Sequence, residues 1–150
     1  MVADNMGKLL YEKLSYDIIG CIYEVYNDLG PAHKEQVYHN ALKIMFDSKN
    51  IQYKDEPRLK IKFKGKDVGT YVPDFIVEDK IVIELKSTLT MPMVFEKQLY
   101  YYLRGTKYKV GYLVNFGSDK LEIRRRVYET LRENPRGSAF DPRQSALNKT

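Results

Sequence analysis

The sequence has a single cysteine, no tryptophan and no apolar run long enough to span a membrane. With Cys21 alone an intramolecular disulfide is excluded, and a reducing cytoplasm is the compartment we predict. The first ten residues, MVADNMGKLL, lack the apolar core of a secretory signal peptide. Histidine is also scarce: we expect His33 in a loop and His39 on a helix surface, without obvious metal-ligand partners. A small-molecule metallohydrolase is therefore a weak alternative.

The chain is large enough to bury one hydrophobic core, since it has 150 residues of which 43% are hydrophobic. Apolar content falls from about Arg132, so we predict a single domain over residues 1–131 and a disordered basic tail over 132–150. A net charge of +5, from 25 basic and 20 acidic residues, is compatible with a nucleic-acid partner but does not require one. The 13 tyrosines could build a homodimer contact or a base-stacking surface.

Hydrophobic periodicity predicts an order of helices and strands. Two helices come first, over Met6–Leu29 and His33–Ser48, separated by Gly30-Pro31. A strand meander follows, near Ile51–Asp55, Arg58–Lys64, Val68–Val77 and Lys80–Ser87. A third helix over Met93–Arg104 precedes strands at Lys109–Asn115 and Leu121–Tyr128. This order predicts an α/β fold with a central mixed sheet flanked by helices.

Charged residues interrupt the strand IVIELKS, residues Ile81–Ser87, where a buried strand should stay apolar. Because side chains alternate along a strand, Glu84 and Lys86 share one face and Leu85 points to the other. A tight turn at Asp79 and Lys80 would set Asp74, from the preceding strand, beside Glu84. Two acids and a lysine therefore meet in a small volume.

Two carboxylates on neighbouring strands can hold Mg²⁺, which favours oxygen ligands and activates a bound water. A lysine beside them can orient that water or stabilise the charge of a phosphoryl transition state. A structural ion pair at a strand end is the alternative explanation of the same residues. The chemistry that uses all three groups is metal-assisted hydrolysis.

Several motifs together resemble those of a known family. They are Pro73-Asp74 with Glu84-Leu85-Lys86, the segment Leu29–Tyr38 (LGPAHKEQVY), the pair Gln98 and Tyr102 in a Q-x-x-x-Y spacing, and Asn115-Phe116-Gly117. The chain resembles the PD-(D/E)xK nuclease superfamily, and within it the GxxExxY group, from about Leu14 to Val127. It departs from the group at Ala32 and His33, where a second glycine is usual.

The resemblance implies a restriction-endonuclease-like αβββαβ core and a nuclease that acts on DNA, with RNA left open. Asp74, Glu84 and the Leu85 carbonyl would ligate Mg²⁺ or Mn²⁺. The other implied site residues are Lys86 to orient the attacking water, Glu35 as an added ligand or water-holder, and Gln98 with Tyr102 at the rim. From the residues alone, Glu35 could instead serve the helix dipole and Gln98 could be a surface amide.

Basic residues gather in two places that could contact a phosphate backbone. Lys60 and Lys62 alternate with apolar residues along one predicted strand, and Arg124 and Arg126 lie in another. A solvated outer strand face explains the lysines equally well. The same fold could therefore also serve as a catalytically silent nucleic-acid-binding or protein-assembly module.

Overall fold

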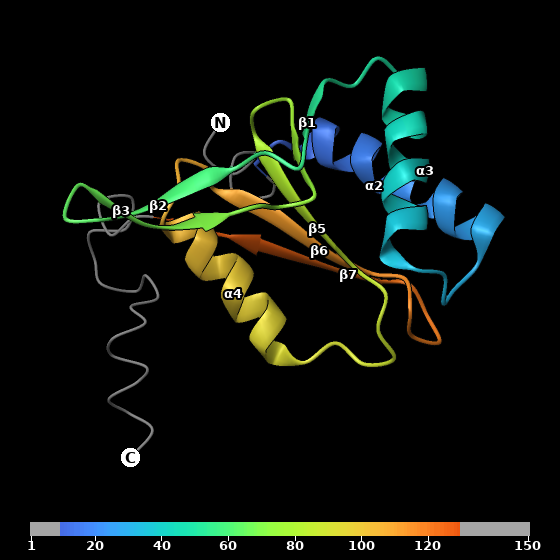
Figure 1. Cartoon of the computed structure of the whole chain (residues 1–150). Coiled ribbons are helices and arrows are strands. Elements are labelled where there is room, and N and C mark those ends of the chain that lie inside the picture. The colour runs from blue at the N-terminus through green and yellow to red at the C-terminus, as the bar shows by residue number, and fades with distance from the viewer. Residues whose placement is uncertain (1–9, 130–150) are drawn as a thin grey trace, which may run out of the picture.

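The computed structural model describes residues 10–129, and in it a mixed sheet is covered by helices on both faces (Figure 1). The predicted helix start at Met6 and the predicted tail over 132–150 lie outside these residues. The helices are α2 (Glu12–Leu29), α3 (Glu35–Ser48) and α4 (Met93–Arg104). The strands are β1 (Tyr53–Asp55), β2 (Leu59–Phe63), β3 (Lys66–Tyr71), β4 (Phe75–Val77), β5 (Ile81–Lys86), β6 (Val110–Asn115) and β7 (Glu122–Val127).

The main sheet has the strand order β1-β4-β5-β6-β7. Strand β5 lies at its centre, antiparallel to β4 and parallel to β6, so the sheet is mixed as predicted. Its alternating residues serve two hydrophobic clusters: Ile83 packs with residues of α2 and α3, and Val82 packs with residues of α4. A buried β-branched run of this kind suits a central strand covered on both faces.

Helix α2 packs a stripe of residues at helical spacing against the sheet, namely Ile18, Cys21, Ile22 and Val25. It begins at Glu12 because Tyr11 takes a left-handed conformation, with a φ of 57°, so the predicted helical course through Leu10 and Tyr11 is wrong. Gly30 ends it with a φ of 74°, and its N–H donates to the Tyr26 carbonyl. The next helix can therefore start a few residues later, close to the end of β5.

The segment Val68–Val77 is two strands and not the single strand that we predicted. Strand β3 pairs with β2 in a separate two-stranded sheet, whereas β4 joins the main sheet between β1 and β5. Pro73 lies at the break, where it lacks the N–H that a continuous central strand would have to donate. The turn that follows β4 is also shifted by one residue: Glu78 and Asp79 take the positive φ values, 54° and 52°. A simple meander is therefore wrong, and Asp74 lies at the junction of two sheets.

Candidate active site at the end of strand β5

The last residues of β5 divide between the two faces of the sheet, as the strand alternation predicts. Leu85 is 1% exposed and packs in the cluster formed with α2 and α3. Lys86 is half-buried on the side of α4, where its Nζ lies 4.5 Å from the centroid of the Phe95 ring. Glu84 shares that side. An acid and a base therefore project together beneath α4.

Asp74, which directly precedes β4, lies beside the same end of β5. It directly precedes Phe75, whose register partner on β5 is Ile83, so Asp74 and Glu84 lie next to each other across the two strands. Oδ2 of Asp74 accepts a hydrogen bond from the Leu85 N–H at 2.8 Å. The predicted meeting of Asp74 and Glu84 is thus explained by strand register.

The Glu84 carboxylate is half-buried, and its Oε1 has no hydrogen-bond partner among the described residues. The buried Tyr71 hydroxyl lies beside this carboxylate, although the two groups form no hydrogen bond of good geometry. The pKa of Glu84 is raised to about 7, mainly by burial and secondly by the negative charge of Asp74. The Tyr71 hydroxyl and the Lys86 ammonium lower it, but by less. A half-buried acid of raised pKa beside a second acid is a location that a cation would stabilise.

Glu35 comes from the first turn of α3, where no side chain caps the helix. Partial desolvation and then the Asp74 carboxylate raise its pKa, while Lys86 and His39 act to lower it. Glu35 is exposed, and its carboxylate lies within electrostatic range of Asp74, Lys86 and His39. The structure thus brings Glu35, Asp74, Glu84 and Lys86 to one place, from α3 and from two strands of the sheet.

His39 is 3% exposed, so the expectation that it lies on a helix surface is wrong. Its Nδ1 lies 2.9 Å from Asp74 Oδ1, and its Nε2 lies 2.6 Å from Asp55 Oδ1. His39, Asp74 and Glu56 also form a group in which one potential metal-ligand atom from each lies within 4.8 Å of the others. The prediction that the histidines have no metal-ligand partners is therefore also wrong for His39.

A signal for His39 was available in the sequence, because it follows Glu35 by four residues and thus lies on the same helix face. Asp55 and Glu56 gave no comparable signal. Glu56 takes a φ of 48° just after β1, and its N–H donates to the Asp74 carbonyl. Its nearness to Asp74 depends on the pairing of β1 with β4, which is not a local property of the chain.

The two predicted rim residues differ in their surroundings. Gln98 is exposed on α4. Tyr102, one turn further, is half-buried and stacks on Tyr71 with the ring centroids 3.8 Å apart. Because Tyr71 in turn lies beside Glu84, Tyr102 is connected to the acidic site through an aromatic pair.

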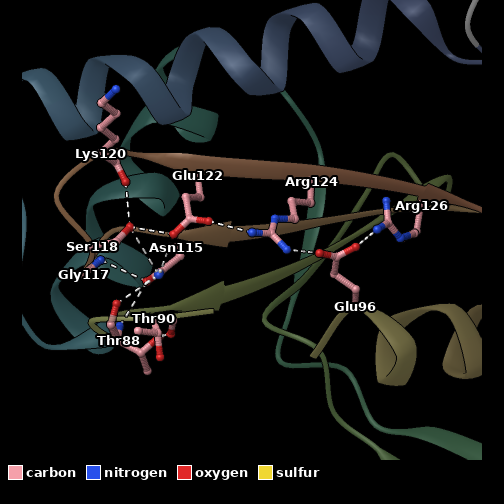
Figure 2. A network of polar contacts seen from close by, with 10 residues as sticks. All are labelled: Thr88, Thr90, Glu96, Asn115, Gly117, Ser118, Lys120, Glu122, Arg124 and Arg126. Atoms are coloured by element: carbon pink, nitrogen blue, oxygen red, sulfur yellow. Dashed lines mark hydrogen bonds and ion pairs between the residues drawn. The ribbon is translucent and has the colours of Figure 1, made fainter. Parts of the chain in front are cut away.

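The predicted phosphate-contacting residues are largely engaged in ion pairs. Arg124 and Arg126 both pair with Glu96, a buried residue of α4, and Arg124 also pairs with Glu122 at 2.8 Å (Figure 2). Lys62 pairs with Asp67, and Lys60 is exposed. Both arginines therefore help to join α4 to β7, and a role in phosphate contact stays a prediction.

Asn115 holds the backbone of Thr88, in the loop after β5, and that of Gly117, as Figure 2 shows. The Asn115 side chain is buried; its Oδ1 accepts hydrogen bonds from the N–H groups of Thr88 and Gly117, each at 3.0 Å, and its Nδ2 donates to the Thr88 carbonyl at 2.9 Å. Next to it, Phe116 stacks on Tyr38 at 4.0 Å. Asn115-Phe116-Gly117 therefore ties the end of β5 to helix α3.

Gly117→Ala is expected to lower the free energy of unfolding by about 2 kcal/mol. A Cβ at this position would lie 2.3 Å from the backbone nitrogen of Thr88, which cannot move away as a flexible side chain could. Chemical denaturation measures the change. Gly105→Ala is the matched control, because its Cβ would meet only an ordinary contact of 3.6 Å. Equal stabilities for the two variants would contradict the close approach.

An acid pair and a lysine at the end of a central strand define a candidate site for metal-dependent hydrolysis. The family model of the PD-(D/E)XK nuclease superfamily matches residues 12–126. The chain belongs to this superfamily, and its mixed sheet flanked by helices is consistent with a restriction-endonuclease-like fold. The superfamily supports a nuclease-type function and metal binding, and it suggests an interaction with nucleic acid.

Among solved structures, the crystal structure of SSO0001 is similar with a TM-score of 0.45 and 19% sequence identity, over 85% of this chain and 73% of that one. No match was found among the curated proteins. In the part of the chain that the structure describes, none of the helices has the length and apolar character to cross a membrane.

Proposed function

We propose that this protein is a Mg²⁺- or Mn²⁺-dependent nuclease that hydrolyses phosphodiester bonds in DNA, and that it belongs to the GxxExxY group of the superfamily. The observation that supports this most strongly is the half-buried Glu84 carboxylate, which lies beside Asp74 and on the same strand face as Lys86, with burial and the Asp74 charge raising its pKa to about 7.

The residues present fit a hard divalent cation. Asp74, Glu84 and the Leu85 carbonyl would hold it through oxygen atoms, which Mg²⁺ and Mn²⁺ both accept. Both Asp74 oxygens already accept hydrogen bonds, yet a carboxylate oxygen has a second lone pair available for an ion. When bound, the ion supplies a water of lowered pKa and neutralises charge on the phosphoryl group.

The protein's own groups do the remaining work. Lys86 would orient the attacking water and stabilise charge on the phosphoryl oxygens, since its ammonium shares a strand face with Glu84. Glu35, at the start of α3, would hold a water or add a ligand from the opposite side. Gln98 and Tyr102 would form the rim on α4. Phosphate contacts further out would come from Lys60, Lys62, Arg124 and Arg126.

Cleavage assays on labelled DNA and RNA of one sequence, single- and double-stranded, test the proposal. We expect DNA cleavage with Mn²⁺ or Mg²⁺ and none with EDTA. Cleavage that persists in EDTA would contradict the metal requirement. Binding of DNA in EDTA, combined with no cleavage under any metal, would instead identify a silent binding module. Preferential cleavage of RNA would replace the DNA assignment and keep the nuclease.

A further inference from the structure

His39 is buried at the back of the candidate site, although the motif residues give it no part in the chemistry. We propose that His39 is a positioning residue that holds the Asp74 carboxylate in the orientation needed to ligate the cation, and that Asp55 in turn orients His39. The inference rests on the proposed function, because only there does Asp74 serve as a metal ligand.

Two donors on different elements fix the Asp74 carboxylate. The Leu85 N–H on β5 holds Oδ2 at 2.8 Å, and Nδ1 of His39 on α3 holds Oδ1 at 2.9 Å. The Asp74 side chain is 18% exposed, so water has limited access to replace either donor. With both oxygens held, the plane of the carboxylate is set, and the remaining lone pairs point in fixed directions.

The His39 ring is itself held from three directions. Its Nε2 faces Asp55 at 2.6 Å, its plane stacks on Phe75 with centroids 4.3 Å apart, and its backbone belongs to α3. Asp55 also pairs with Lys43 at 2.7 Å. The contacts therefore form a row of Asp74, His39, Asp55 and Lys43 from the site to the surface. Asp55 therefore holds the His39 ring from the side opposite Asp74.

Direct ligation by His39 is the alternative, because potential ligand atoms of His39, Glu56 and Asp74 lie within 4.8 Å of one another. Both ring nitrogens, however, already face carboxylate oxygens at hydrogen-bond distance. To bind an ion, Nδ1 would have to give up its contact with Asp74, and the stack on Phe75 leaves the ring little room to turn. The geometry therefore favours a donor that acts through Asp74.

Mn²⁺ affinity of the full chain, measured by calorimetry on His39→Phe and His39→Asn, tests the proposal. His39→Phe keeps an aromatic ring for the stack on Phe75 and removes both ring nitrogens, so we expect about a tenfold weaker affinity. His39→Asn is expected to retain most of the affinity, because its amide nitrogen can take the place of Nδ1. His33→Phe is the matched control, since the His33 ring contacts the Leu29 carbonyl and is exposed. It should bind Mn²⁺ as the wild type does.

A role limited to stability would lower the melting temperature of metal-free His39→Phe but leave the Mn²⁺ affinity of the folded protein unchanged. An unchanged Mn²⁺ affinity in His39→Phe would overturn the positioning role. If Asp74→Ala still abolished Mn²⁺ binding in the same experiment, the proposed function would stand. Nitrogen hyperfine coupling to bound Mn²⁺ that disappears in His39→Phe would overturn the positioning role in favour of direct ligation. Absence of Mn²⁺ binding by the wild type would overturn it as well. Intact Mn²⁺ binding and the expected variant pattern, without cleavage of any nucleic acid, would refute only the nuclease assignment.

Discussion

Lys86→Met is expected to lower the rate of metal-dependent cleavage about a thousandfold. The reason is that it removes a preorganised positive charge that would stabilise the negative charge developing on the phosphoryl group. The Lys86 ammonium is half-buried and shares its strand face with Glu84, so a bulk cation cannot easily replace it. Methionine has a similar length and polarisable bulk, which preserves the packing against Phe95. Single-turnover cleavage at saturating Mn²⁺ isolates the chemical step from metal binding.

Lys80→Met is the matched control, because Lys80 is exposed in the turn directly before the same strand. It should cleave at the wild-type rate. Lys86→Met should also keep the wild-type melting temperature, which separates lost chemistry from lost folding. Cleavage within a few-fold of the wild type would show that Lys86 is a structural ion-pair residue, and would remove the lysine from the proposed mechanism.

The end of β5 could be predicted because the evidence for it is local. Alternation places Glu84 and Lys86 on one face of any strand, and the buried apolar run before them fixes that strand at the centre of the sheet. The helix that ends at Gly30 was predictable for the same reason, since glycine and proline act on their own segment. These elements needed no knowledge of the remainder of the chain.

The remainder of the site depends on contacts between distant segments. Asp55 and Glu56 reach Asp74 because β1 pairs with β4, across the hairpin of β2 and β3 that leaves the main sheet at Pro73. The helical pattern placed His39 correctly in α3, but only the packing against Phe75 shows that its ring is buried. Sequence periodicity identifies which residues share a face, and it says little about which elements cover that face.

Glu84→Gln is expected to stabilise the metal-free protein at pH 8 while it abolishes cleavage. Burial and the Asp74 charge raise the pKa of Glu84 from its ordinary 4.5 to about 7, so the folded state favours the protonated acid. The resulting stability is fully present below pH 4.5 and is lost as the pH rises through 7, where the ionised group must stay partly buried. A pKa shift of this size lowers the free energy of unfolding above pH 7 by about 3 kcal/mol.

Glutamine cannot ionise and therefore keeps that contribution at every pH. Urea denaturation in EDTA should show wild-type stability falling relative to Glu84→Gln between pH 5 and 8, whereas the exposed control Glu24→Gln should follow the wild type. Mn²⁺ at pH 8 should restore stability to the wild type but not to Glu84→Gln, because the amide has lost the charge that attracts the ion. Parallel profiles of stability against pH for the wild type and Glu84→Gln would mean that folding does not raise the pKa of Glu84. The metal-free protein is therefore expected to lose stability at neutral pH, because the ionised Glu84 carboxylate has no metal ion beside it.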